Sequence, residues 1–202
     1  MMKRIVLAGL LGGIAMFVWS SLAHDVLPLG QVGVQEIPNE QAVLAAMQTS
    51  LGAGSGFYFY PGMGLGPNAS GDQKRAAMQQ YQQKLNANPS GILVYHPAGA
   101  KALTAGQLIT EFVTELVEAI LVVFLLAQTR IASFAGRVGF VTVAGILAAI
   151  VTNIPYWNWY GFPANYTAAY MSIEIIGFLV TGIVAAALIK PAPAAHTLKM
   201  AA

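Results

Sequence analysis

The sequence predicts a membrane protein of the all-α class: a bundle of four transmembrane helices with a small α/β extracytoplasmic cap between helices 1 and 2. Two observations predict it. The chain of 202 residues is 56% hydrophobic and 9% charged, with a mean hydropathy of +0.62, whereas soluble domains carry about 25% charged residues. Four apolar stretches also reach the roughly 20 residues that a helix needs to cross a bilayer.

The four expected spans cover residues 5–23, 107–127, 138–156 and 167–189. The first span also has an alternative interpretation as a cleavable signal peptide. Its apolar run is longer than the core of a usual signal peptide, so we expect a retained helix. The chain then divides into transmembrane helix 1 at 1–23, the cap at 24–104, transmembrane helices 2–4 at 105–190 and a cytoplasmic tail at 191–202.

Basic residues that flank the spans predict the orientation. They fall on one side of the membrane, and that side carries no Asp or Glu. Because loops rich in Lys and Arg stay in the cytoplasm, both termini are expected inside and the cap outside. In a bacterium this places the chain in the inner membrane with a periplasmic cap. The flanking residues are Lys3, Arg4, Arg130, Arg137, Lys190 and Lys199.

The cap is expected to contain two helices and two strands. Asn39 is a suitable N-cap for the first helix, and Ser70 or Asp72 for the second. Residues 57–60 and 92–95 are rich in aromatic and β-branched side chains, which favour strands. The two strands can pair as a small sheet.

Four of the eight acidic residues lie within the expected spans. Glu111, Glu115 and Glu118 have the spacing i, i+4 and i+7, which places them on one face of the second helix, away from lipid. Glu174 lies in the fourth span, and at 1.5 Å per residue it lies about 13 Å from the outer end, against about 16 Å for Glu115. The opposite, apolar face of the second helix comprises Phe112, Val113, Leu116, Ile120, Val123 and Phe124.

Small and polar stripes on the other spans predict how the helices pack. Gly9 and Gly13 have the four-residue spacing of closely packed transmembrane helices. In the third span the expected inward stripe is Gly139, Thr142, Ala149 and Asn153. In the fourth it is Thr167, Tyr170, Glu174, Gly177 and Thr181.

The protonation state of the glutamates depends on the groups that surround them. An ionised carboxylate at bilayer depth costs a few kcal/mol, and the four expected spans contain no Lys or Arg. At least one glutamate is therefore expected to be protonated at pH 7, or a cation to lie among them. His24, Asp25 and Asn153 are expected at the outer mouth of a polar cavity.

Four interpretations of the glutamates compete. They form a proton- or cation-binding site in a small ion- or solute-binding protein, they belong to an accessory subunit and meet a partner chain of a larger complex, or they are protonated and only hydrogen-bond across helices. The fourth is a metal-dependent membrane enzyme with Glu115, Glu118 and Glu174 as weak candidate ligands, since a carboxylate-only site suits Mg²⁺, Ca²⁺ or Mn²⁺. The leading expectation is a non-enzymatic protein.

Composition excludes several cofactors and partners. The chain has no cysteine, so it holds no Cys-ligated iron–sulfur cluster. No His lies in an expected span, which argues against haem held by transmembrane residues, and any other cofactor is unknown. The sequence has no basic run of the kind that binds nucleic acid. The expected partners are membrane lipids and other membrane subunits.

An aromatic cluster follows the third span, in an outward turn expected at 155–166. Trp and Tyr favour the headgroup zone of a membrane. The cluster is therefore expected to be an interfacial anchor, with a docking surface for a lipid, a pigment or another subunit as the alternative. Its residues are Tyr156, Trp157, Trp159 and Tyr160.

Five short segments have distinctive sequences: 17–24 (FVWSSLAH), 37–40 (IPNE), 56–62 (GFYFYPG), 95–97 (YHP) and 156–163 (YWNWYGFP). Together they resemble a family of small, uncharacterised bacterial four-helix inner-membrane proteins. The resemblance covers nearly the whole chain. It implies a bacterial inner membrane and an outward-facing cap, and it implies no activity, cofactor or functional residue.

Overall fold

A computed structural model of the chain describes residues 2–189, which form two compact units. The helical unit comprises residues 2–34, 103–158 and 162–189, and the second unit comprises residues 35–102 and 159–161. Residues 24–34, expected in the cap, therefore pack with the helices. The expected cytoplasmic tail at 191–202 lies outside the described residues, as does Lys190.

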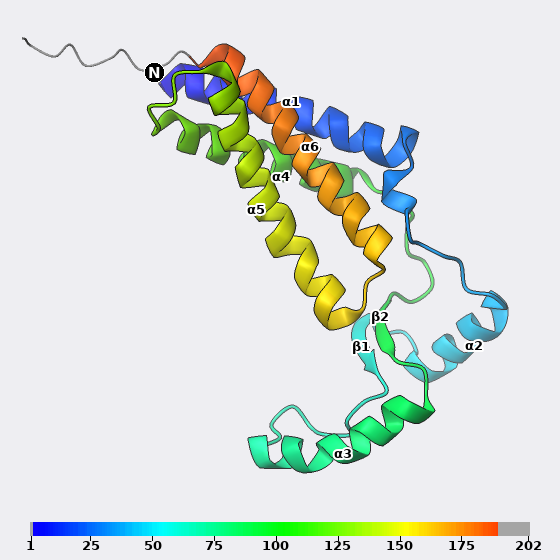
Figure 1. Ribbon diagram of the computed structural model, residues 1–202. Coiled ribbons are helices and arrows are strands. Elements are labelled where there is room, and N and C mark those ends of the chain that lie inside the picture. The colour runs from blue at the N-terminus through cyan, green and yellow to red at the C-terminus, as the bar shows by residue number, and fades with distance from the viewer. Residues whose placement is uncertain (1, 190–202) are drawn as a thin grey trace, which may run out of the picture. The chain divides into compact units, whose positions relative to one another are not determined.

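Four long helices make up most of the helical unit (Figure 1). Among the described helices, three segments are long and apolar enough to cross a membrane: Met2–Val26, Phe134–Tyr160 and Ala164–Leu188. The remaining long helix has 23 residues but carries three glutamates, and it is not one of these three. The four helices are α1 (Met2–Ser21), α4 (Ala105–Ala127), α5 (Phe134–Tyr160) and α6 (Ala164–Leu188).

Two glycines of α1 allow this helix to pack closely against α4. A Cβ added to Gly13 would lie 2.8 Å from the Cα of Leu116, and one added to Gly9 would lie 2.8 Å from the Cα of Ile120. Any side chain at either position would therefore push the two backbones apart. The close packing predicted from the glycine spacing is confirmed, and it places α4 directly against α1.

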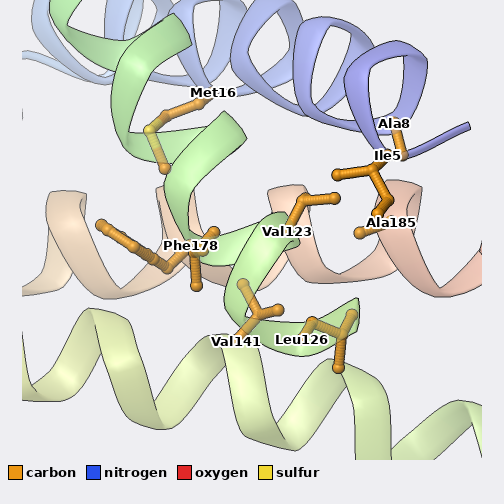
Figure 2. Close-up of a cluster of buried hydrophobic side chains, with 9 residues drawn as sticks. Ile5, Ala8, Met16, Val123, Leu126, Val141, Phe178 and Ala185 are labelled. Atoms are coloured by element: carbon orange, nitrogen blue, oxygen red, sulfur yellow. The ribbon is translucent and has the colours of Figure 1, made fainter. Parts of the chain in front are cut away.

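Apolar side chains from all four helices meet in one cluster (Figure 2). Val123 of α4 and Val141 of α5 are fully buried in it. Because lipid is as apolar as these side chains, close packing and not exclusion of water holds such helices together in a membrane. Val123 was predicted on the apolar face of its helix, and the structure packs it into this cluster. The labelled residues in Figure 2 are Ile5, Ala8, Met16, Val123, Leu126, Val141, Phe178 and Ala185.

The buried stripe of α5 repeats every four residues. It contains Asn153 and Ala149, as expected, but not Gly139. A Cβ added to Gly139 would have no other atom within 4 Å, so this glycine faces open space. Thr142 is only partly buried. The error arises because periodicity defines a stripe but not how the helix is rotated against its neighbours. The observed stripe is Arg137, Val141, Gly145, Ala149 and Asn153.

Arg137 lies inside α5, although it was expected before the third span. Its side chain is 8% exposed, and its guanidinium donates to the carbonyl of Ile189 and to that of Ser133 at 3.4 Å. Ile189 is the C-cap of α6, where helix carbonyls lack partners and carry partial negative charge. The buried cation is therefore compensated by the end of a neighbouring helix.

The turn between α5 and α6 is shorter than the expected 155–166. Helix α5 continues through Pro155 to Tyr160, since the fixed φ of proline is helical even though its ring costs one backbone hydrogen bond. Gly161 follows with φ of +71°, a conformation that ends helices and favours glycine. The aromatic cluster therefore lies on the last turns of a helix.

The second unit contains the two helices and the two strands that the sequence predicts. Strand β1 (Gly56–Tyr60) pairs antiparallel with β2 (Gly91–Tyr95), with Tyr58 opposite Leu93. Helix α2 (Glu40–Leu51) precedes β1, and α3 (Gly71–Ala87) joins the strands. The Tyr95 hydroxyl donates to the carbonyl of Gly52 at 2.9 Å and so ties β2 to the end of α2.

The helix starts of this unit differ in how they are capped. Ser70 and Gln73 form a reciprocal capping box at α3, with the backbone of Gln73 donating to Ser70 Oγ at 3.2 Å. Asn39 precedes α2 as expected, but it adopts φ of +56° and its side chain makes no capping hydrogen bond. Asn tolerates this left-handed conformation better than most residues, so Asn39 provides the bend into the helix and not a cap.

Candidate functional site

Helices α1, α4 and α6 surround a cavity of about 510 Å³ in the helical unit. This volume lies within the range of small-molecule sites. All four glutamates singled out from the sequence line it, so the structure brings them to one place. They are Glu111, Glu115 and Glu118 of α4 and Glu174 of α6.

Glu115 is the most buried of the four carboxyl groups. Its side chain is 6% exposed, and its Oε2 atom is buried without a hydrogen-bond partner. Glu111, Glu118 and His24 are the ionisable groups that interact with it through space. A buried polar atom without a partner costs free energy, and a buried charge costs more. A proton or a bound cation would relieve that cost.

Glu111 and Glu118 line the same cavity but are exposed. All three glutamates of α4 border this one cavity, which fits the predicted shared face. That this face is turned away from lipid stays a prediction. Helix α1 meets α4 beside it, where Leu116 and Ile120 contact the glycines of α1.

Glu174 has a hydrogen-bond partner on the neighbouring helix. Asn153 of α5 donates through Nδ2 to Glu174 Oε2 at 2.6 Å, and the same amide donates to the carbonyl of Ala149 at 3.0 Å. Both side-chain N–H groups of Asn153 are therefore used. Asn153 was expected at the mouth of the cavity; it lines a second, smaller cavity of about 240 Å³ and reaches the main one through its bond to Glu174.

His24 and Asp25 line the main cavity, and their predicted place at its outer mouth stays a prediction. They lie in a short π-helix, η1 (Leu22–Val26), which follows α1. Nδ1 of His24 lies 2.9 Å from the carbonyl oxygen of Ser20. The His24 ring makes a T-shaped contact with Tyr170 of α6, with ring centroids 5.8 Å apart. Single π-turns in α-helices occur frequently at functional sites. Sequence periodicity carries no signal for such a turn.

Aromatic side chains form the remaining wall, and the sequence reasoning assigned no role here to Phe17, Trp19 or Phe178. Trp19 of α1 donates from Nε1 to the carbonyl of Ile173 on α6 at 2.9 Å, which holds the indole in place. Tyr170 stacks on Tyr166 with ring centroids 4.3 Å apart. Placing α1 against the glutamate face could have suggested Phe17 and Trp19, but only the tertiary structure shows that contact.

The aromatic cluster of α5 is largely solvent-facing in the isolated chain. Trp159 is 78% exposed, and Tyr156 lines the second cavity. This exposure is compatible with an interfacial anchor and with a docking surface, so both remain predictions. The cluster residues are Tyr156, Trp157, Trp159 and Tyr160.

The metal interpretation gains no support from the geometry. In the part of the chain that the structure describes, no group of three or more His, Asp or Glu side chains is placed to hold a metal ion. Glu115, Glu118 and Glu174 share the cavity but do not form such a group. Their role as metal ligands therefore stays a prediction.

Comparison with protein-family models, with curated proteins and with solved structures gives no match. The described helices include three that are long and apolar enough to cross a membrane, and α1, α4 and α6 line an acidic, partly aromatic cavity.

Proposed function

We propose that the chain is an integral membrane protein that binds a small cation in the glutamate-lined cavity. The observation that carries the proposal is the buried Oε2 of Glu115, which has no hydrogen-bond partner. Glu111, Glu118 and Glu174 line the same cavity, and no Lys or Arg is among its lining residues. A cation is therefore the occupant that best compensates the negative charge.

We infer that α4 crosses the membrane together with the other three helices. Its 23 residues are long enough, and α1 packs along it through Gly9 and Gly13. The start of α1, the turn between α4 and α5 and the end of α6 lie at one end of the helical unit (Figure 1). That end carries Lys3, Arg4 and Arg130, which favours a cytoplasmic location in a bacterial inner membrane.

A second candidate function is that of an accessory subunit of a larger membrane complex. The observation that favours it is the exposure of Glu111 and Glu118 on the open side of the cavity. Carboxylates exposed to lipid are costly, and a partner helix across the open side would shield them. Co-purification of a partner whose helix cross-links to Glu111→Cys would support this role, and a lone monomer in mild detergent would contradict it.

Thermal unfolding in a non-ionic detergent tests the cation site. A ligand that binds only the folded state stabilises it, by about 2.7 kcal/mol at 100 times its Kd. We expect at least one cation from a panel of sodium, potassium, magnesium, calcium and alkylammonium chlorides to raise the Tm of the unaltered protein. Glu115→Gln should abolish that rise while the protein still folds.

The matched control is Glu40→Gln, which removes an exposed carboxylate of α2, outside the cavity. This variant should keep the full rise in Tm. Equal responses of Glu115→Gln and the unaltered protein, or no response to any cation, would contradict the proposed function.

A further inference from the structure

The cavity combines two kinds of wall. Its lining includes carboxyl groups of α4 and α6 and aromatic rings of α1 and α6. An organic ammonium ion interacts with both, because its charge attracts carboxylates and the negative faces of rings while its carbon atoms pack against apolar surface. The rings are those of Phe17, Trp19, Tyr170 and Phe178.

Two of these rings are held in position before any ligand binds. The N–H of Trp19 is already used in the bond to Ile173, so the indole offers a ligand only its apolar ring. The Tyr170 ring contacts two others, being roughly perpendicular to His24 and stacked with Tyr166. A binding surface that is already ordered loses little conformational entropy when a ligand arrives.

An inorganic divalent cation fits the cavity poorly. Ca²⁺ takes 6–8 oxygen ligands and Mg²⁺ requires an octahedral set, whereas no described group of three acidic or His side chains is placed to hold a metal. The carboxyl groups of Glu111, Glu115 and Glu118 are instead spread along two turns of α4. Charge distributed over a cavity of about 510 Å³ suits a larger ion of low charge density.

The ammonium group could belong to a free amine or to a lipid headgroup. A zwitterionic lipid would bring its phosphate close to five acidic residues, namely Asp25, Glu111, Glu115, Glu118 and Glu174. No Lys or Arg lines the cavity to compensate that phosphate. The charge balance therefore favours a free amine.

We propose that the ligand of this cavity is a small free organic ammonium ion, held by Glu115 against the rings of Phe17, Trp19 and Tyr170. This inference rests on the proposed function and specifies the class of cation. Glu115 provides a buried carboxyl group with an unpartnered oxygen, which pairs with the ammonium ion when it is ionised. The rings provide faces that attract an organic cation.

Trp19 fluorescence tests the inference directly. The chain has three tryptophans, and Trp157→Phe with Trp159→Phe leaves Trp19 as the single reporter in the cavity wall. The protein is purified in a maltoside detergent and titrated with butylammonium, tetramethylammonium, sodium and magnesium chlorides at constant ionic strength. We expect saturable fluorescence changes with the two organic ions and none with sodium or magnesium.

Variants in the same background assign the contacts. Glu115→Gln should weaken butylammonium binding by at least about 10-fold, as expected for loss of a charged partner. Tyr170→Leu and Phe17→Leu should each weaken it by about 2- to 30-fold, the range of single cation–π contacts. Glu40→Gln, far from the cavity in sequence and exposed in α2, should leave the affinity unchanged.

The other outcomes separate the two proposals. A Glu115-dependent response to sodium or magnesium but not to the organic ions would overturn this inference and leave the proposed function standing. No response to any salt, in fluorescence or in Tm, would overturn both. Butylammonium binding that is unchanged in both ring variants would overturn the inference. A response only in nanodiscs that contain phosphatidylethanolamine would assign the site to a lipid and overturn the free amine.

Discussion

Asn153 of α5 donates a hydrogen bond to Glu174 of α6, with Nδ2 and Oε2 2.6 Å apart. The donor side chain is 9% exposed, so the bond forms largely away from solvent. Glu174 lines the main cavity and Asn153 lines the second one. The pair is therefore the side-chain bridge between the two cavities, and it holds the Glu174 carboxyl at the cavity wall.

Removing this bridge should destabilise the protein. Asn153→Ala leaves Glu174 without its partner on α5, and we expect the free energy of unfolding to fall by about 1–3 kcal/mol. Thermal unfolding in detergent measures the loss. Thr152→Ala is the control, because the Thr152 hydroxyl donates only to Ala148 in its own helix, and its effect should stay within about 0.5 kcal/mol. Similar losses in the two variants would show that the bridge contributes nothing.

Gly13 should tolerate no side chain. Gly13→Ala places a Cβ 2.8 Å from the Leu116 backbone, so α1 and α4 must separate, and we expect a loss of about 1–3 kcal/mol. Gly139→Ala is the matched change in α5, where no atom lies within 4 Å of the added Cβ. It should be neutral or stabilise the helix by up to about 1 kcal/mol. If both alanines behave alike in thermal unfolding, the glycine contact does not control packing.

Arg137 should contribute far more to the free energy of unfolding than a neighbouring exposed arginine. Arg137→Leu leaves the Ile189 carbonyl at the end of α6 without its charged donor, and hydrogen bonds to charged groups are worth about 1.5–3 kcal/mol. We expect a loss of that size in the free energy of unfolding. Arg130 is exposed, so Arg130→Leu should change stability by less than about 0.5 kcal/mol. Equal effects would contradict a role for the buried bond.

Glu115 should lower the stability of the folded protein when no ligand is present. Glu115→Leu removes a buried carboxyl oxygen that has no partner, and we expect the ligand-free protein to gain about 1–3 kcal/mol. Glu111→Leu changes an exposed carboxyl group of the same cavity and should gain less. A clear loss of stability in Glu115→Leu would show instead that this glutamate is a structural residue.

The ends of α4 should lie on opposite sides of the membrane. The chain has no cysteine, so Lys101→Cys and Arg130→Cys each provide a single thiol. In sealed inverted and right-side-out vesicles, a membrane-impermeant maleimide should label each cysteine from one side only, and the two from opposite sides. Arg4→Cys serves as a side marker and should label with Arg130→Cys. Labelling of Lys101→Cys and Arg130→Cys from the same side would show that α4 does not cross.

Much of the local structure could be predicted from the sequence. The Thr-x-x-Gln spacing of Thr104 and Gln107 is that of a capping box, and α4 starts with one, the backbone of Gln107 donating to Thr104 Oγ1 at 3.2 Å. The strand pair β1 and β2 forms where aromatic and β-branched residues cluster. These features depend on residues within a few positions of one another or on strong local patterns, and such patterns can be recognised in the sequence.

Other predictions were wrong because they depended on how a helix is rotated against its neighbours or on where the helix ends. Thr142 and Gly139 lie off the buried stripe of α5, and Pro155 does not end that helix. Periodicity identifies a stripe of small residues, but several stripes of one apolar helix look alike. Which one faces the protein is decided by side chains on other helices, such as Phe178, whose Cβ would clash with any Cβ at Gly145.

The sequence by itself determined that four glutamates lie in apolar segments and that three of them share one face of α4. Only the tertiary structure decided their different surroundings. It joins Asn153 to Glu174 across 21 residues and Trp19 to Ile173 across 154 residues, and it leaves Glu115 Oε2 buried without a partner. Helix period is a local property of the backbone, whereas burial and hydrogen-bond partners depend on segments that meet only when the chain is folded.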